Sequence, residues 1–136
     1  MRIRLAYGLA TSLMLVMMLL MSSSTSASQR SFKSNEIALV FCAYVRDDDT
    51  ARLQRKLRDL RVRMRDMYTS IRCNNASLIQ FALRNNSHNV GSFIARSVSI
   101  DALQEMGDYQ WAREQELLMT ETGLILANRI KDYRKD

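Results

Sequence analysis

The sequence predicts an all-α fold, a small bundle of short helices. Its 136 residues contain no proline and only four glycines, so little interrupts a helix. Between residues 49 and 71, apolar side chains recur at alternating gaps of four and three, which keeps them on one helix face. Clusters of Asp, Asn and Ser separate the apolar stretches and predict the ends of the helices. The members of the apolar stripe are Leu53, Leu57, Leu60, Met64, Met67 and Ile71.

The first 27 residues have the features of an export signal. Arg2 and Arg4 precede an almost wholly apolar run over residues 5–21, and a small-x-small cleavage site ends at Ala27. We expect cleavage after Ala27 and a periplasmic or secreted protein. The alternative is an uncleaved anchor in the inner membrane, because about seventeen apolar residues are near the lower limit for a span. Cleavage removes Arg2 and Arg4 and so lowers the net charge from +6 to +4.

The remaining residues are expected to form one domain. Residues 28–34 are rich in serine and are expected to be a disordered lead-in. Residues 35–131 are expected to form a single helical domain, and residues 132–136 a frayed tail. Residues 36–45 are apolar nearly all round, which predicts a buried helix and leaves a short buried strand as the alternative.

Three consecutive acids, Asp47, Asp48 and Asp49, precede the basic stretch. Carboxylates at this place cap the N-terminus of the next helix and interact favourably with its dipole. A calcium loop is the less favoured reading, because its spaced oxygen ligands and turn glycine are missing.

A helical hairpin is predicted after the basic stretch. Asn74 and Asn75 predict a turn, residues 76–84 a helix, residues 85–87 a second turn, and residues 88–98 a second short helix. A similar order of apolar and polar positions occurs about 39 residues earlier, which suggests two ankyrin-like helix pairs followed by a C-terminal helix. In this alignment Leu39 and Ala43 fall on Leu78 and Ala82. The Thr-Pro-Leu-His signature of ankyrin repeats is absent.

Ser99 or Asp101 is expected to cap a brief helix through Met106, which Gly107 ends. Asp108 is then expected to cap the last element.

This last element is expected to run through Trp111 and residues 117–119, with residues 120–123 interrupting it before residues 124–130. Trp111, the only tryptophan, is expected to fill the core.

The charge is distributed unevenly along the chain. Residues 49–72 hold eight basic and three acidic side chains, whereas residues 99–136 hold five basic and eight acidic ones. We expect these two parts to attract each other within the fold. The basic side chains also form a candidate site for an anionic surface; the alternative is that they are simply a solvated helix face. The candidates are Arg52, Arg55, Lys56, Arg58, Arg61, Arg63 and Arg65.

The two cysteines, Cys42 and Cys73, predict a disulfide, because the chain is expected to be exported to an oxidising compartment. This bond conflicts with a straight helix over residues 50–71. Such a helix is about 31 Å long, whereas the Cα atoms of a disulfide lie within about 7 Å. Apolar and basic side chains alternate over residues 60–65, as in an extended segment. We therefore favour the disulfide with a break between Arg58 and Val62; two free thiols on a continuous helix are the alternative.

Cys42, the basic segment, Cys73-Asn74 and Phe81-Ala82 together resemble a domain of unknown function, DUF3718, found in small exported proteins of gammaproteobacteria. The resemblance covers about residues 36–98. The glycine that usually follows Cys-Asn in this family is Asn75 here, and asparagine also tolerates a left-handed turn. The resemblance implies a periplasmic location and carries no established activity.

We expect an exported periplasmic protein that binds another envelope protein or supports the envelope. The alternative is a binder of lipid phosphate groups or acidic glycans through residues 52–65. Nucleic acid is not expected, because only Tyr68 lies near the basic side chains for base stacking. No cofactor, metal or catalytic residue is expected, since His88 is the only histidine. A hydrolase or redox role, such as a thiol acting with His88, is the weaker alternative.

Overall fold

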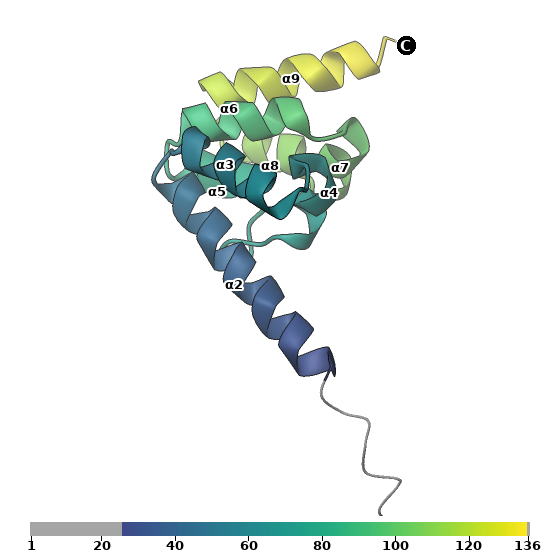
Figure 1. Ribbon diagram of the computed structural model, residues 1–136. Coiled ribbons are helices and arrows are strands. Elements are labelled where there is room, and N and C mark those ends of the chain that lie inside the picture. Colours follow the sequence, from purple (N-terminus) through teal and green to yellow (C-terminus); the bar gives the residue numbers. More distant parts are fainter. Residues whose placement is uncertain (1–25, 136) are drawn as a thin grey trace, which may run out of the picture. The chain divides into compact units, whose positions relative to one another are not determined.

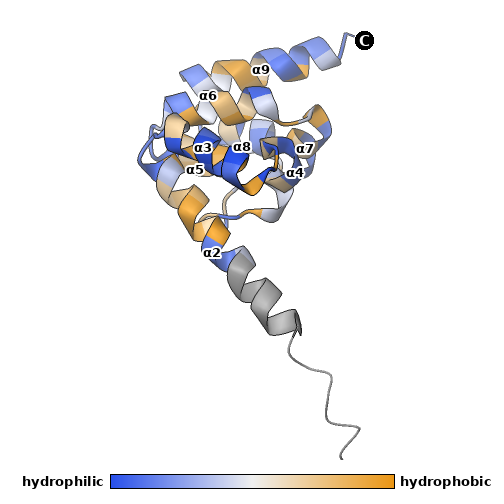
Figure 2. Ribbon diagram, viewed as in Figure 1, coloured by the Kyte–Doolittle hydropathy of each residue, from blue (hydrophilic) through white to orange (hydrophobic). Residues whose placement is uncertain are grey.

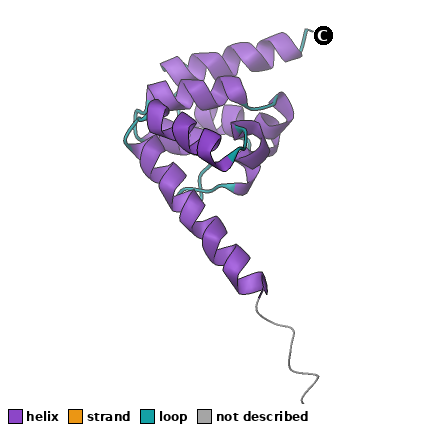
Figure 3. Cartoon of the chain, in the orientation of Figure 1, coloured by secondary structure: helices purple, strands orange, loops and turns teal. Residues whose placement is uncertain are grey.

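Helices make up nearly all the regular structure of the computed structural model, which describes residues 26–135 (Figures 1 and 3). Over these residues there is no strand, and one isolated bridge pairs Cys73 with Ala76. The predicted all-α fold is confirmed. The elements are α2 (Ser26–Arg46), α3 (Thr50–Leu60), α4 (Met64–Met67), the 3-10 helix η1 (Tyr68–Ser70), α5 (Leu78–Arg84), α6 (His88–Ser97), α7 (Ile100–Glu105), α8 (Asp108–Glu114) and α9 (Glu121–Tyr133).

The chain divides into two units, Met1–Ser34 and Asn35–Asp136, and the packing described here is that of the second. The predicted export signal lies almost wholly in residues 1–25, outside the described residues. In the part of the chain that the structure covers, no helix combines the length and apolar character needed to cross a membrane.

Helix α6 lies at the centre of the second unit and contacts α3, α4, α5 and α9 (Figure 1). Gly91 of α6 lies against α9, because a Cβ atom at this position would lie 2.6 Å from Thr122 Oγ1. Glycine at this position therefore lets the two backbones pack closely. The largest fully buried side chains come from seven elements and include Phe41, Leu53, Tyr68, Leu78, Ile79, Leu83, Ile94, Leu103 and Leu126.

Helix α2 corrects two expectations. Residues 28–34, expected to be disordered, are helical, because the stretch contains no glycine or proline and adds to a helix already formed by residues 35–46. The expected all-round burial is wrong for Leu39, which is 71% exposed, while Phe41 and Val45 are fully buried. Leu78, its counterpart in the proposed repeat, is fully buried, so the two helix pairs do not share one pattern of burial.

The predicted break in the basic stretch is confirmed. Asp49 Oδ1 accepts from the Arg52 backbone N–H at 2.8 Å and caps α3, as expected. Helix α3 ends at Leu60, and Arg61 then adopts a left-handed conformation with φ of 55°. This turn lets the chain reverse toward α2, where Cys42 and Cys73 form the predicted disulfide with a Cα–Cα distance of 5.7 Å.

Asp48 caps a helix distant in the sequence. Its Oδ1 accepts from the Val90 backbone N–H at 2.8 Å, and its Oδ2 accepts from Asn89 Nδ2 at 2.7 Å. Because Ser87 provides no side-chain cap for α6, the carboxylate of Asp48 stabilises that N-terminus instead.

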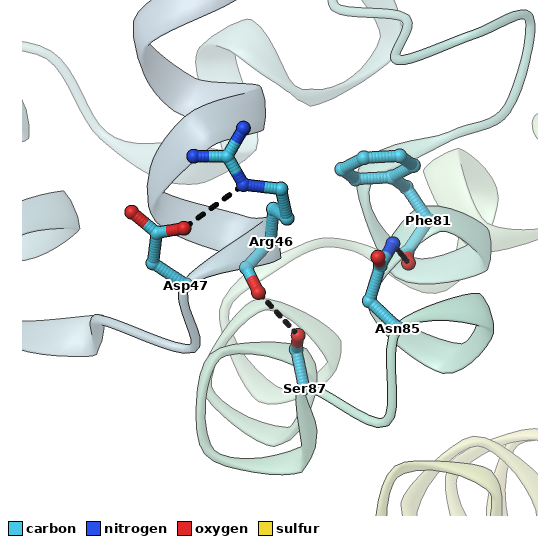
Figure 4. Close-up of polar contacts among 5 residues, drawn as sticks. All are labelled: Arg46, Asp47, Phe81, Asn85 and Ser87. Carbon is cyan, nitrogen blue, oxygen red and sulfur yellow. Dashed lines mark hydrogen bonds and ion pairs between the residues drawn. The ribbon is translucent and has the colours of Figure 1, made fainter.

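A second contact joins the end of α2 to the turn between α5 and α6 (Figure 4). Ser87 Oγ donates to the Arg46 carbonyl oxygen at 3.4 Å, and Asn85 Nδ2 donates to the Phe81 carbonyl oxygen at 2.7 Å. The polar turn over residues 85–87, predicted from its Asn and Ser content, is confirmed, and it contacts the C-terminal end of α2.

The C-terminal elements correct three further expectations. Gly107, with φ of 67°, is the N-cap of α8, and Asp108 is buried one position inside the helix. Helix α8 ends at Glu114, so residues 117–119 are not helical. Helix α9 continues through Tyr133, so residues 132–133 are not frayed.

Arg129 of α9 forms hydrogen bonds with the C-terminal end of α6. Its Nη1 donates to the carbonyl oxygens of Ala95 and Val98 at 2.5 and 2.6 Å. The guanidinium thus satisfies acceptors at the C-terminus of α6 and complements the negative end of its dipole.

Candidate functional site

The basic side chains of residues 52–65 lie mainly on the surface. Because Leu53 and Leu57 of α3 are buried, the basic positions between them face solvent, and Figure 2 shows α3 coloured mainly as hydrophilic. Lys56 is only half-buried. The exposed basic residues are Arg52, Arg55, Arg58, Arg61, Arg63 and Arg65.

The ion pairs of the described residues join near neighbours only. Arg52 Nε lies 2.9 Å from Asp49 Oδ2, and Arg63 Nε lies 2.8 Å from Asp66 Oδ2. Hydrogen bonding from Arg63 lowers the pKa of Asp66 below its usual value. The third pair joins Arg46 to its neighbour. The expected attraction between the basic stretch and the acidic C-terminal part therefore forms no ion pair within residues 34–135.

A groove of about 590 Å³ lies where α3, α4 and α6 meet. Its apolar side chains are Leu57, Met64 and Phe93, of which the first two are buried. Four arginines also line it: Arg58, Arg63, Arg65 and Arg96.

The groove brings together three of the seven predicted basic residues, Arg58, Arg63 and Arg65. Arg52, Arg55, Lys56 and Arg61 do not line it.

Arg96 is a groove residue that the sequence did not reveal. It follows Phe93 by three positions on α6, so both side chains point to the same face of that helix. Its exposed position beside an apolar residue is a weak signal, and the packing of α6 against α3 makes it part of the groove.

The groove is suited to a ligand with both an anionic and an apolar part. Each guanidinium offers several N–H donors that can bind a carboxylate or a phosphate in a bidentate manner. Four cationic groups around one apolar floor raise the local positive potential, and the floor can bury a small apolar side chain.

A second depression, of about 410 Å³, continues the groove along α3 and α6. The two share Gln54, Phe93, Arg96 and Ser97, and the second ends at Glu121. The elongated site is therefore polar along its length, with its positive charge concentrated at the end formed by Arg63 and Arg65.

A separate cluster of polar side chains is buried where η1, α5 and α8 meet. Asp108 accepts from Tyr68 Oη and Ser77 Oγ, each at 2.5 Å, and from Gln80 Nε2 at 3.1 Å. Gln80 Nε2 also donates to the Met106 carbonyl oxygen at 3.0 Å. Burial raises the pKa of Asp108, although its hydrogen bonds oppose this effect. Burial and the nearby carboxylate raise the pKa of Tyr68 well above its usual value.

This cluster stabilises the fold and has no room for a substrate. Tyr68, Ser77 and Asp108 are fully buried, so no reactant reaches them without unfolding. Neither cysteine is a free thiol, and His88 Nδ1 lies 3.3 Å from Thr122 Oγ1 of α9. Among the described residues, no group of three or more His, Cys, Asp or Glu side chains is placed to hold a metal ion.

The raised pKa of Asp108 predicts a pH dependence of stability. The protonated carboxyl stabilises the fold, and this contribution is complete below the unfolded-state pKa of about 3.9 and is lost as the pH rises through the higher folded-state pKa. Asp108→Asn cannot titrate, and its amide can donate to Tyr68 Oη while accepting from Ser77 and Gln80. We expect the native chain to lose stability relative to Asp108→Asn as the pH rises from about 4 to 7, measured by urea unfolding.

Asp132→Asn, which removes one exposed carboxylate, provides the matched control. Asp108→Ala, which leaves three buried donors without an acceptor, should cost about 3 kcal/mol. If the free energies of unfolding of the native chain and of Asp108→Asn changed with pH in parallel, the raised pKa of Asp108 would be contradicted.

In a comparison with protein families, residues 41–105 match the model described as "Protein of unknown function (DUF3718)". Comparisons with curated proteins and with solved structures give no match. The matched segment contains both cysteines, the basic stretch and all four arginines of the groove.

Proposed function

Since residues 41–105 match the model of a domain of unknown function, DUF3718, we propose a function from the groove itself: the chain is an exported, non-enzymatic protein that binds an acidic segment of an envelope protein. The proposal includes the export signal over residues 1–27 and a periplasmic or secreted location. The Cys42–Cys73 disulfide supports the location, because such bonds persist in oxidising compartments.

One observation carries the proposal: Arg58, Arg63, Arg65 and Arg96 line a single groove whose floor is apolar. A chain that required only solubility would have no reason to place four like charges together, since like charges repel and destabilise the fold. Arg63 is partly neutralised by Asp66, whereas no ion pair within residues 34–135 involves Arg58, Arg65 or Arg96. These three guanidinium groups are therefore available to carboxylates of a partner.

The test compares two double variants that remove the same charge. Arg65→Gln with Arg96→Gln alters the groove, and Arg55→Gln with Arg61→Gln alters exposed arginines outside it. The probe is a short labelled peptide of alternating glutamate and leucine, and binding is followed by fluorescence anisotropy. We expect the groove pair to weaken binding by about tenfold or more, and the outside pair to change it by less than about threefold.

The substituted side chains are exposed, so both double variants should keep the helical content and melting temperature of the native chain. Equal weakening by both pairs would contradict a defined site. Absence of peptide binding by the native chain at low salt would contradict the proposal itself, because ionic attraction is then strongest.

A second candidate is binding to an anionic surface, either lipid phosphate groups or acidic glycans. The exposed side chains of Arg52, Arg55 and Arg61 favour it, because they extend the positive surface beyond the groove. Its signature is binding to vesicles that contain phosphatidylglycerol, weakened to a similar degree by both double variants and steeply by salt.

A further inference from the structure

The turn between α8 and α9, residues 114–119, is an acidic segment with an exposed apolar side chain. Glu114 and Glu116 are exposed, and Met119 is 82% exposed. Met119 is the most exposed of the large apolar side chains in the described part of the chain. Moving a thioether out of water and against an apolar or aromatic surface lowers the free energy.

The turn is held in a fixed shape. Glu116 has a left-handed backbone with φ of 59°, and the Leu117 N–H donates to the Ala112 carbonyl oxygen at 2.8 Å. Thr120 Oγ1 donates to the Leu117 carbonyl oxygen at 2.7 Å, and the same oxygen atom caps α9. A shape fixed before binding loses little conformational entropy on docking.

The turn carries negative charges and an exposed apolar side chain, which complement the positive charges and apolar floor of the groove. The turn does not contact the groove of its own chain. None of its residues lines the groove, and no ion pair of residues 34–135 involves Glu114 or Glu116. Both ends of the turn are fixed by α8 and α9, so it cannot move to the groove of its own chain.

We propose that the groove binds the turn of a second copy of this chain, an inference that rests on the proposed function and names its partner. Glu114 and Glu116 pair with the arginines, and Met119 covers the apolar floor beside Phe93. Glu121 at the far end of the groove repels the acidic turn and directs it to the end formed by Arg63 and Arg65. Because every copy has one groove and one turn, the contact can occur twice in a closed dimer.

Charge exchange tests this pairing. Arg65→Glu with Arg96→Glu makes the groove acidic, and Glu114→Lys with Glu116→Lys makes the turn basic. We expect the native chain to self-associate at low salt and to dissociate at high salt, measured by sedimentation velocity. Each double variant alone should weaken association by at least about tenfold, because like charges then face each other. An equimolar mixture of the two should associate again, since both contacts become complementary.

The control is Glu105→Lys with Asp132→Lys, which reverses the same charge at exposed positions outside the turn. It should associate as the native chain does. A native chain that stays monomeric at low salt, or a mixture that stays monomeric, overturns the inference. Neither result affects the peptide-binding test, so the failure of self-association and the failure of the proposed function are distinguishable.

Discussion

Replacing both Cys42 and Cys73 by serine is expected to lower the free energy of unfolding by about 3.5 kcal/mol. The bond joins residues 31 positions apart, and opening a loop of this length gives the unfolded chain entropy of about that size. A loss of this size is a large share of the stability of a small domain, which is about 5 to 15 kcal/mol. Urea unfolding followed by circular dichroism measures the difference.

Reduction of the native chain should produce a loss similar to that of the double serine variant, and reductant should leave that variant unchanged. A loss below about 1 kcal/mol would mean that the reduced chain holds α2 by packing alone.

Gly123→Ala is expected to destabilise the chain by about 4 kcal/mol. A Cβ atom at Gly123 would lie 2.0 Å from the Leu117 carbonyl oxygen and 2.7 Å from the Leu118 Cα atom. That carbonyl oxygen accepts hydrogen bonds from both the backbone N–H and the hydroxyl of Thr120, so it cannot retreat without breaking the cap of α9. Steric conflict with fixed backbone is among the most destabilising effects of a single substitution. Thermal and urea unfolding measure it.

Gly107→Ala is the matched control, because a Cβ atom there meets nothing within 4 Å. Its positive φ of 67° still makes alanine strained, at a cost of about 1 kcal/mol. A smaller effect at Gly123 than at Gly107 would contradict the close approach between α9 and the preceding turn.

The break in the basic stretch could be predicted because two features of the sequence agreed. A Cys42–Cys73 disulfide is incompatible with a straight helix between the two cysteines. The period-two pattern over residues 60–65 predicted where that helix breaks. The structure ends α3 at Leu60 and places the left-handed residue at Arg61. The caps at Asp49 and Ser99 could also be predicted, since a cap involves residues three positions apart. The caps at Ser77 and Thr120 are equally local but were not predicted.

The buried position of Asp108 could not be predicted from local sequence patterns. An aspartate after a glycine has the signature of an N-cap, and only tertiary packing reveals that Tyr68, Ser77 and Gln80 surround it. Arg96 is similar, because its place in the groove depends on the angle at which α6 crosses α3. The apolar pattern of residues 36–45 predicted burial on every face, whereas Leu39 is exposed to solvent.

The Asp108 cluster shows that the segment matched by the family model is shorter than the segment that packs together. The family match ends at residue 105, before the carboxylate on which Tyr68, Ser77 and Gln80 depend. It also ends before Arg129, whose guanidinium satisfies the last carbonyl oxygens of α6. A fragment cut at the family boundaries would bury polar groups with no partner and expose the apolar face of α6. We therefore expect a fragment cut at the family boundaries to unfold, and a fragment that extends through α9 to stay folded.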